Sequence, residues 1–267
     1  MNHKRNQLVD LNNAGAYRIP VSRVEGRTFI SNGQRFYDFC SCNYLGYEFD
    51  PHVHATAQAY AENWGVLSGW SRMEADSQVY LDLEQRICDW LAAPKTLLGM
   101  SVTMNGFSIM PGIAKKGVIL ADSLLHTVVW EAARLARDHG AELVKFRHQD
   151  MADLERLLEA HADRSPKIVA VDGVYSISTV HAPIRALQAL CEKYDAWLYV
   201  DDAHGFGILG EAPSAANPYG KGGKGVVAHA GGDYSRTFYV TSFGKAFCAQ
   251  NAFTVIPSAY EEDVRAM

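Results

Sequence analysis

Short apolar runs alternate with amphipathic runs from residue 96 to residue 241, and this alternation limits the possible folds more than any other feature of the chain. The strand-like runs are residues 96–101, 117–121, 142–146, 167–172, 197–201 and 237–241. Residues 127–139, 150–162 and 184–194 have helical periodicity; in the first of them Val128, Ala132, Leu135 and Ala136 share one face. Strands that alternate with helices predict an α/β fold with a mostly parallel sheet and flanking helices.

The composition allows a large core and excludes several classes of function. Hydrophobic residues make up 48% of the 267 residues, so disorder is excluded as the main state. The net charge is −5 and no long basic run occurs, so we expect no nucleic-acid partner. The sequence also lacks a run of about 18 apolar residues, so we expect no membrane span.

Cysteine and histidine usage argues against disulfides and metal sites. Of the five cysteines, only Cys40 and Cys42 lie close together in the sequence, which favours reduced thiols. His52 and His54 are the other potential metal pair, but no third ligand lies nearby, so no metal is expected. A secretory signal has an apolar segment after its basic residues, and residues 1–17 have none. We therefore expect a cytoplasmic protein.

Polar side chains follow most of the predicted strands. Ligands of open α/β sheets bind at the carboxyl ends of the strands, so these side chains are the candidates for an active site. They are Asp122, His126, Ser176, Asp201, Asp202, His204, Ser242 and Lys245. The set contains nucleophilic, acidic and basic groups, which suits catalysis.

Three short motifs suggest other functions but lack the required context. Residues 205–210 match G-x-G-x-x-G, yet two prolines follow where a dinucleotide loop must lead into a helix. Residues 220–225 (GKGGKG) lack the Ser or Thr of a P-loop. Residues 242–245 fit the S-x-x-K of serine acyl enzymes, but the further motifs of those enzymes are not expected in the few residues that follow.

The sequence Asp201-Asp-Ala-His204, followed by Ser242-Phe-Gly-Lys245, resembles fold type I enzymes that use pyridoxal 5′-phosphate (PLP). It is most similar to the α-oxoamine synthases. The resemblance extends over roughly residues 18 to 267 and includes residues 42–46 (CNYLG), 69–72 (GWSR) and 172–176 (DGVYS). It implies the large domain of a fold type I PLP-dependent transferase.

The resemblance implies a role for each candidate that matches the family pattern. Lys245 would bind PLP as a Schiff base, and the small residues beside it would leave room for the cofactor. Asp201 would pair with the pyridine nitrogen and keep it protonated, so that the ring acts as an electron sink. His204 and Ser176 would lie near the phenolic oxygen, and His126 would stack on the ring and orient the substrate. Asp202 is expected to point to the other side of the chain.

The phosphate site departs from the family pattern. A Gly-aromatic pair usually forms the phosphate turn, and alignment on Asn105 places Ser101 and Val102 there instead. Backbone N–H groups and hydroxyls can bind a phosphate, so these two residues remain the candidates. Ser242 matches a threonine that reaches the phosphate in the family. Cys42 stands where many members have an asparagine that helps to hold the substrate carboxylate.

These features together predict a PLP-dependent acyltransferase. It would condense an amino acid with an acyl thioester, from coenzyme A or a carrier protein, and release an α-aminoketone after decarboxylation. We expect an N-terminal arm over residues 1–60 and a PLP-binding large domain over residues 61–267, without the usual C-terminal small domain. The family's shared active sites and the aromatic residues Tyr60, Trp64 and Trp70 predict a homodimer.

Two alternatives remain open at this point. The first is another PLP reaction on the same fold, such as transamination. The second is a non-catalytic or partial subunit, because the family's small domain normally supplies the arginine that binds the substrate carboxylate. Retention of Lys245, Asp201 and His204 argues against a complete loss of catalysis.

Overall fold

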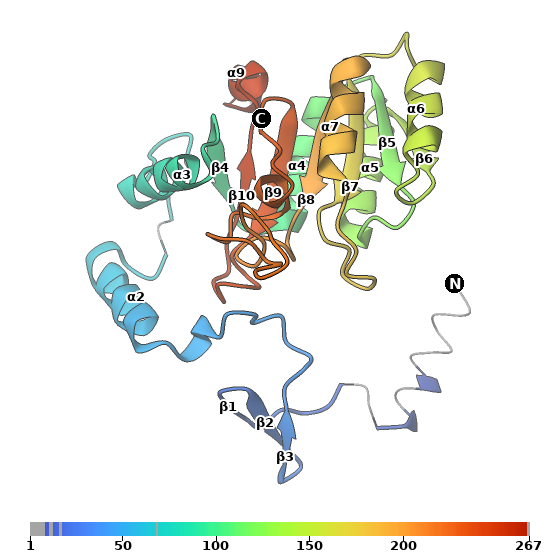
Figure 1. Ribbon diagram of the computed structural model, residues 1–267. Helices are drawn as coiled ribbons and strands as arrows, with labels where there is room; N and C mark the ends of the chain where they lie inside the picture. The colour runs from blue at the N-terminus through green and yellow to red at the C-terminus, as the bar shows by residue number, and fades with distance from the viewer. Residues whose placement is uncertain (1–8, 11–12, 16–17, 68, 266–267) are drawn as a thin grey trace.

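A seven-stranded sheet with helices on both faces forms the body of the protein (Figure 1). The computed structural model describes residues 9–10, 13–15, 18–67 and 69–265. The strands are β4 (Thr96–Gly99), β5 (Val118–Asp122), β6 (Glu142–Phe146), β7 (Lys167–Asp172), β8 (Ala196–Asp201), β9 (Thr237–Ser242) and β10 (Ala252–Val255). Their order is β4-β10-β9-β8-β7-β5-β6. β10 pairs antiparallel with both β4 and β9, and the other strands point the same way.

Helices cover the two faces of this sheet and bury two hydrophobic clusters. One cluster packs under α3 (Gln78–Leu91), α6 (Met151–Ala160) and α7 (Ile184–Lys193). The other packs under α4 (Val102–Ala114) and α5 (Thr127–Asp138), and includes Tyr260 of the short helix η2 (Ser258–Tyr260). In β5, Val118 and Leu120 belong to the first cluster, whereas Ile119 and Ala121 belong to the second. Burial on both faces explains why such strands are continuous apolar runs.

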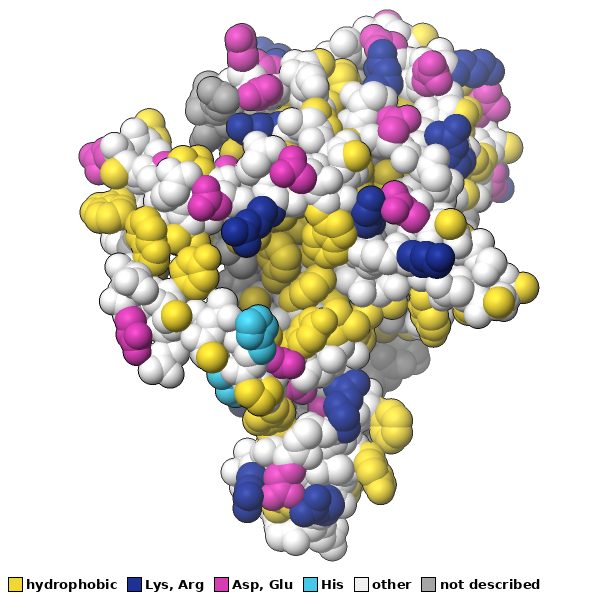
Figure 2. Space-filling view, turned by 60° about the vertical axis from the view of Figure 1, so that its left-hand side comes forward, with side chains coloured by type: hydrophobic (Ala, Val, Ile, Leu, Met, Phe, Trp, Pro, Cys, Tyr) yellow, Lys and Arg dark blue, Asp and Glu magenta, His cyan; other side chains and the backbone are white. Residues whose placement is uncertain are grey.

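The N-terminal part lies beside this body and packs loosely. It contains a small antiparallel sheet of β1 (Arg23–Glu25), β2 (Thr28–Ser31) and β3 (Gln34–Tyr37), followed by η1 (Tyr47–Phe49) and α2 (Pro51–Trp64). α2 buries none of its residues. Figure 2 shows hydrophobic side chains gathered in the hollow between the small sheet and the large domain. These segments therefore gain little stability from the rest of the chain.

The predicted α/β fold with a mostly parallel sheet is confirmed. The structure adds α4 and β10, which the sequence analysis did not assign, and α8 (Val226–His229) within an otherwise loop-like segment; the last helix, α9 (Glu261–Arg265), follows η2. Within the described ranges, no helix is long and apolar enough to cross a membrane. The predicted arm (residues 1–60) and large domain (residues 61–267) stay predictions, and residues 1–8, 11–12, 16–17, 68 and 266–267 of them lie outside the described residues.

Candidate active site

The carboxyl ends of β4, β5, β7, β8 and β9 meet at one edge of the sheet, and a cavity of about 230 Å³ opens there. The eight residues to which the sequence analysis gave a role at the cofactor line this cavity: Ser101, Val102, His126, Ser176, Asp201, His204, Ser242 and Lys245. Of the strand-end candidates, Asp122 and Asp202 do not line it. They come from segments spread over more than half of the chain. The parallel sheet brings them together because it aligns the ends of its strands.

Lys245 lies in the turn after β9 and points at His204. Its Nζ lies 2.7 Å from Nε2 of His204. Burial lowers the pKa of Lys245, although the nearby carboxylate of Asp201 acts in the opposite direction. Gly207 lets the loop after β8 approach this turn, since a Cβ there would lie 2.7 Å from Cβ of Ala246. Burial thus makes it easier for Lys245 to lose its proton, and the deprotonated amine is the nucleophilic form.

His204 joins the lysine to the N-terminal part of the chain. Its Nδ1 lies 2.7 Å from the hydroxyl of Tyr44. Burial, with a smaller contribution from Lys245, lowers the pKa of His204 to about 4, so the imidazole is neutral at pH 7. Burial also raises the pKa of Tyr44 to about 12, so this hydroxyl keeps its proton. Tyr44 can therefore donate to Nδ1, which leaves the Nε2 proton to face the amine of Lys245.

Two buried carboxyl groups, Asp172 and Asp201, lie side by side at the base of the cavity. They end the adjacent strands β7 and β8 and are paired in register. Burial, followed by repulsion from Asp201, raises the pKa of Asp172 to about 8. Burial also raises the pKa of Asp201, whose Oδ1 accepts a 3.1 Å hydrogen bond from the N–H of Ala203. Such a pair favours a cationic group in the cavity, and a protonated pyridine nitrogen is one.

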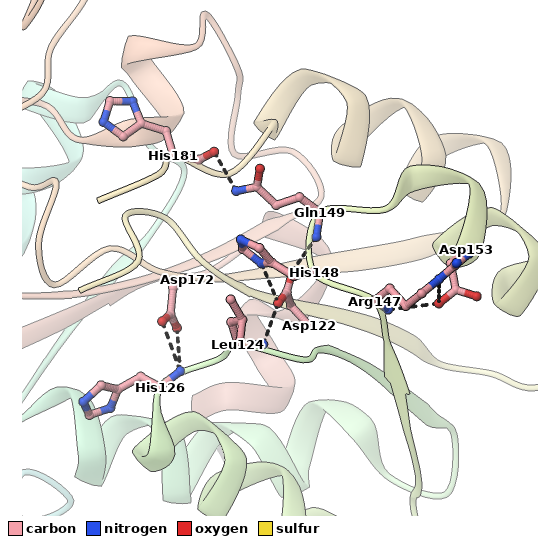
Figure 3. A network of polar contacts seen from close by, with 9 residues as sticks. All are labelled: Asp122, Leu124, His126, Arg147, His148, Gln149, Asp153, Asp172 and His181. Atoms are coloured by element: carbon pink, nitrogen blue, oxygen red, sulfur yellow. Dashed lines mark hydrogen bonds and ion pairs between the residues drawn. The ribbon is translucent and has the colours of Figure 1, made fainter. Parts of the chain in front are cut away.

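Asp172 also fixes the position of His126. Its two carboxylate oxygens accept from the backbone N–H of His126 at 3.0 and 3.2 Å, as Figure 3 shows. His126 is the N-cap residue of helix α5, and its Nδ1 accepts a 3.3 Å hydrogen bond from the N–H of Val128. A neutral His126 therefore carries its proton on Nε2. The sequence analysis missed Asp172, which it treated as the end of an apolar strand.

Asp202 faces away from the cavity, as the sequence analysis expects. Its Oδ2 accepts hydrogen bonds from the hydroxyl of Tyr239 (2.7 Å) and from the N–H of Val226 (2.8 Å). Burial raises the pKa of Asp202 to about 7. This aspartate therefore holds the segment around α8 against the sheet.

Asp122, the first of the strand-end candidates, also has a local role. It accepts from the N–H groups of Leu124 and Gln149 and contacts Nδ1 of His148 (Figure 3). Its carboxylate is thus used to fix the loops after β5 and β6, and it does not line the cavity.

The N-terminus of helix α4 opens into the cavity. Ser101 caps this helix by accepting from the N–H of Met104 at 3.2 Å. The first N–H groups of a helix have no acceptor within the helix, so those of Val102 and Thr103 are suited to bind an anion. Ser242 lines the cavity too, but its hydroxyl donates to the carbonyl of Asn251 (3.0 Å) and accepts from the N–H of Gly244 (2.8 Å). Helix α4 is therefore the stronger candidate for a phosphate site.

Comparisons with known proteins agree with this geometry. The profile of the family described as "Aminotransferase class I and II" matches residues 35–267. An 8-amino-7-oxononanoate synthase from Thiobacillus denitrificans is 34% identical over 225 residues, which are 84% of this chain and 54% of that protein. The corresponding enzyme from Aromatoleum aromaticum is 36% identical over 88% of this chain and 56% of its own length. The chain thus spans about half the length of these curated relatives.

Solved structures show the same fold. The Sphingomonas wittichii serine palmitoyltransferase is 25% identical and matches with a TM-score of 0.84 over 99% of this chain and 65% of its own. A serine palmitoyltransferase variant from S. paucimobilis, solved with bound PLP and myriocin, is 24% identical and gives a TM-score of 0.86. The expected fold type is therefore supported by sequence and by structure.

Proposed function

The chain belongs to the class I and II aminotransferase family, and from that premise we propose that it binds PLP and condenses an amino acid with an acyl thioester, with loss of carbon dioxide, to give an α-aminoketone. One observation carries the proposal. Lys245, Asp201, His204 and His126 line a single cavity at the carboxyl edge of the sheet. The names of the relatives favour this condensation over transamination.

The residues around the cavity fit PLP. Lys245 would hold the aldehyde carbon through its neutral amine, and Asp201 would hold the ring nitrogen. His204 and Ser176 would lie at the phenolic oxygen, and the start of α4, at Ser101 and Val102, would hold the phosphate. When bound, PLP supplies an electron sink that stabilises negative charge on the Cα atom of the amino acid.

The side chains of the chain itself would handle protons and orientation. Nζ of Lys245 lines the cavity and would accept a proton from the substrate or return one to it. The buried carboxylate of Asp201 would keep a proton on the ring nitrogen. Nε2–H of His126 can donate a hydrogen bond to the substrate carboxylate or to the incoming carbonyl oxygen. Asp172 holds this histidine in place through its backbone.

We extend the proposal to assembly and location. A homodimer is supported by exposed apolar side chains at Val66, Leu67, Trp70 and Met73. The cytoplasm is supported by the five cysteines, which are all free thiols in the structure.

Covalent binding at Lys245 is the first test. Protein incubated with PLP should absorb at roughly 420 nm, and borohydride should fix the cofactor on Lys245. Peptide mass mapping checks this position. Lys224, which pairs with Glu211 at 3.0 Å, provides the control: Lys224→Ala should keep the adduct and Lys245→Ala should lose it. An adduct on any other lysine would overturn the assignment.

The reaction itself needs a separate measurement. Mass spectrometry of products formed from pooled amino acids and acyl thioesters should detect an α-aminoketone and carbon dioxide. Formation of a keto acid from an amino donor, without condensation, would identify a transaminase instead.

A further inference from the structure

A second cavity, which we call the side chamber, adjoins the candidate PLP site. Its volume is about 590 Å³, and it shares Val174, Ser176 and His204 with the first cavity. The two cavities therefore have a common wall at these residues. A group bound in the first cavity lies next to the side chamber.

Besides Val174 and Tyr175 of the loop after β7, two further segments supply apolar walls to the side chamber. Tyr44 and Leu45 come from the N-terminal part, and Ile208, Leu209 and Tyr219 come from the loop after β8. The N–H of Gly210 donates to the carbonyl of Tyr219 at 2.7 Å, which holds this loop closed on itself.

The described side chains that line the side chamber carry no charge at neutral pH. The lining contains no Lys, Arg, Asp or Glu. Its two histidines are His204, whose pKa burial lowers to about 4, and His181, whose pKa burial and the neighbouring His229 also lower. The rings of His181 and His229 meet edge to face at 5.6 Å. An ionised group inside the side chamber would therefore lose its hydration without gaining a partner.

We propose that the side chamber binds the acyl chain of the thioester substrate, and that it selects an uncharged aliphatic chain over one that ends in a carboxylate. This inference rests on the proposed function, because it assumes an acyl donor at the first cavity. The wall shared with that cavity, the apolar side chains and the absence of Lys and Arg from the lining all support it. The 8-amino-7-oxononanoate synthases are, by contrast, named for a product with a carboxylate at one end of its chain.

If the acyl chain binds in the side chamber, the affinity should depend on the length of the chain. Burial of each methylene should tighten binding about fourfold until the side chamber is full. A carboxylate at the far end should cancel most of that gain, because the lining offers it no positive partner.

The experiment measures binding and does not depend on turnover. Isothermal titration of the PLP-treated protein would compare hexanoyl-, octanoyl- and decanoyl-CoA with the dicarboxylic thioesters adipoyl-, suberoyl- and sebacoyl-CoA. We expect octanoyl-CoA to bind at least about tenfold more tightly than suberoyl-CoA. Equal affinities at each length, or affinities independent of length, would overturn the proposal.

Arginine variants test whether the acyl chain lies in the side chamber. Ile208→Arg and Tyr219→Arg should shift the preference toward suberoyl-CoA by about tenfold, since each places a cation at the side chamber. Tyr219 is largely exposed, so its variant should fold even if Ile208→Arg does not. Ser214→Arg, on the same loop but outside the lining, should leave the ratio unchanged. An equal shift in all three variants would place the acyl chain elsewhere.

The two proposals can fail separately. Chain-selective binding without any condensation product would support the side chamber as the acyl site and would count against the proposed reaction. Condensation with no preference among chains would support the reaction and overturn the inference about the side chamber.

Discussion

Burial controls the charge of the side chains around Lys245. The pKa of the lysine and that of His204 are lowered, and those of Asp172 and Asp201 are raised, in each case mainly by burial. All four shifts favour the neutral form, so the cavity is poorly suited to isolated charges. A ligand that brings a positive ring nitrogen and a negative phosphate would restore the charge balance near Asp201 and near α4.

Substitution of Asp201 should reduce catalysis far more than stability. An amide at this position cannot hold a proton on the ring nitrogen, so turnover per bound PLP should fall about 100-fold or more in Asp201→Asn, or about 3 kcal/mol of transition-state stabilisation. Asp202→Asn is the matched control, because Asp202 contacts Tyr239 and Val226 instead. It should lower the melting temperature and leave turnover near that of the wild type. The reverse pattern would mean that Asp202 serves the ring.

His204 should make the free energy of unfolding depend on pH between about 4 and 6.5. The pKa of His204 is about 4 in the folded protein and 6.5 in the ordinary, unburied state. Between these values the unfolded chain binds a proton that the folded chain does not, so the free energy of unfolding falls as the pH falls from 6.5 to about 4. Urea unfolding of the wild type and of His204→Gln would isolate this effect. Identical pH profiles for the two proteins would show that His204 titrates normally when folded.

At the level of single residues, sequence patterns predict the functional side chains that follow strands. They do not predict side chains whose contacts are with residues far away in the sequence. Lys245, Asp201 and His126 follow apolar runs, so their place at the edge of the sheet can be inferred from the fold class alone. Tyr44 contacts a histidine 160 residues away, and no local pattern reveals such a pair. Asp172 was missed because its partner is a backbone N–H of another strand-to-helix turn.

Among the elements, helix α4 contributes most to the site and was the hardest to predict. Pro111 lies inside it, and residues buried on it include Gly106, Met110 and Ala114. A helix that is apolar on several faces has no clear amphipathic period, so the pattern that revealed α5 and α7 was absent here. Strand β10 was missed for a similar reason, because its four residues are all buried and form too short a run.

A proline at the start of α4 should weaken PLP binding without breaking the helix. Position 102 is the first residue of the helix, where proline is tolerated, and Ser101 before it is already extended (φ −163°, ψ 160°). Val102→Pro removes one N–H donor, so the dissociation constant for PLP should rise roughly 10-fold, as expected for a charge-assisted hydrogen bond of about 1.5 kcal/mol. Val102→Ala keeps the donor and should bind as the wild type does. Equal affinities in the two variants would exclude this N–H from the phosphate site.

For the molecule as a whole, the contrast between a tightly packed sheet and an open N-terminal part is the main feature. The sheet buries its strands on both faces, whereas Val66 and Met73 are each 96% exposed. Exposed apolar side chains of this kind are a reason to expect an interface. Sequence patterns predicted the sheet well because its periodicity is local, but they could not show how little of the N-terminal part would be covered.

This surface leads us to expect a dimer in solution. Sedimentation at micromolar concentration should give about twice 29.5 kDa. Leu67→Glu, at a side chain that is 82% exposed, should shift the protein toward monomer, because it places a charge in the proposed interface. Leu135→Glu, at a side chain of α5 that is 36% exposed, although the sequence analysis placed it on a face with the buried Ala132 and Ala136, should leave the mass unchanged. A monomeric wild type that binds PLP and turns over substrate would contradict the expectation.

The contact between Tyr44 and His204 also sets an order of events during synthesis. Ribosomes add about 5–20 residues per second, so the 160 residues between the two side chains require about 8–32 s. Throughout that interval His204 has not yet been made, and the aromatic residues near Tyr44 face solvent or a chaperone. The segment made first is thus among the last to reach its final place, and nascent chains should recruit holdases through residues that precede the sheet.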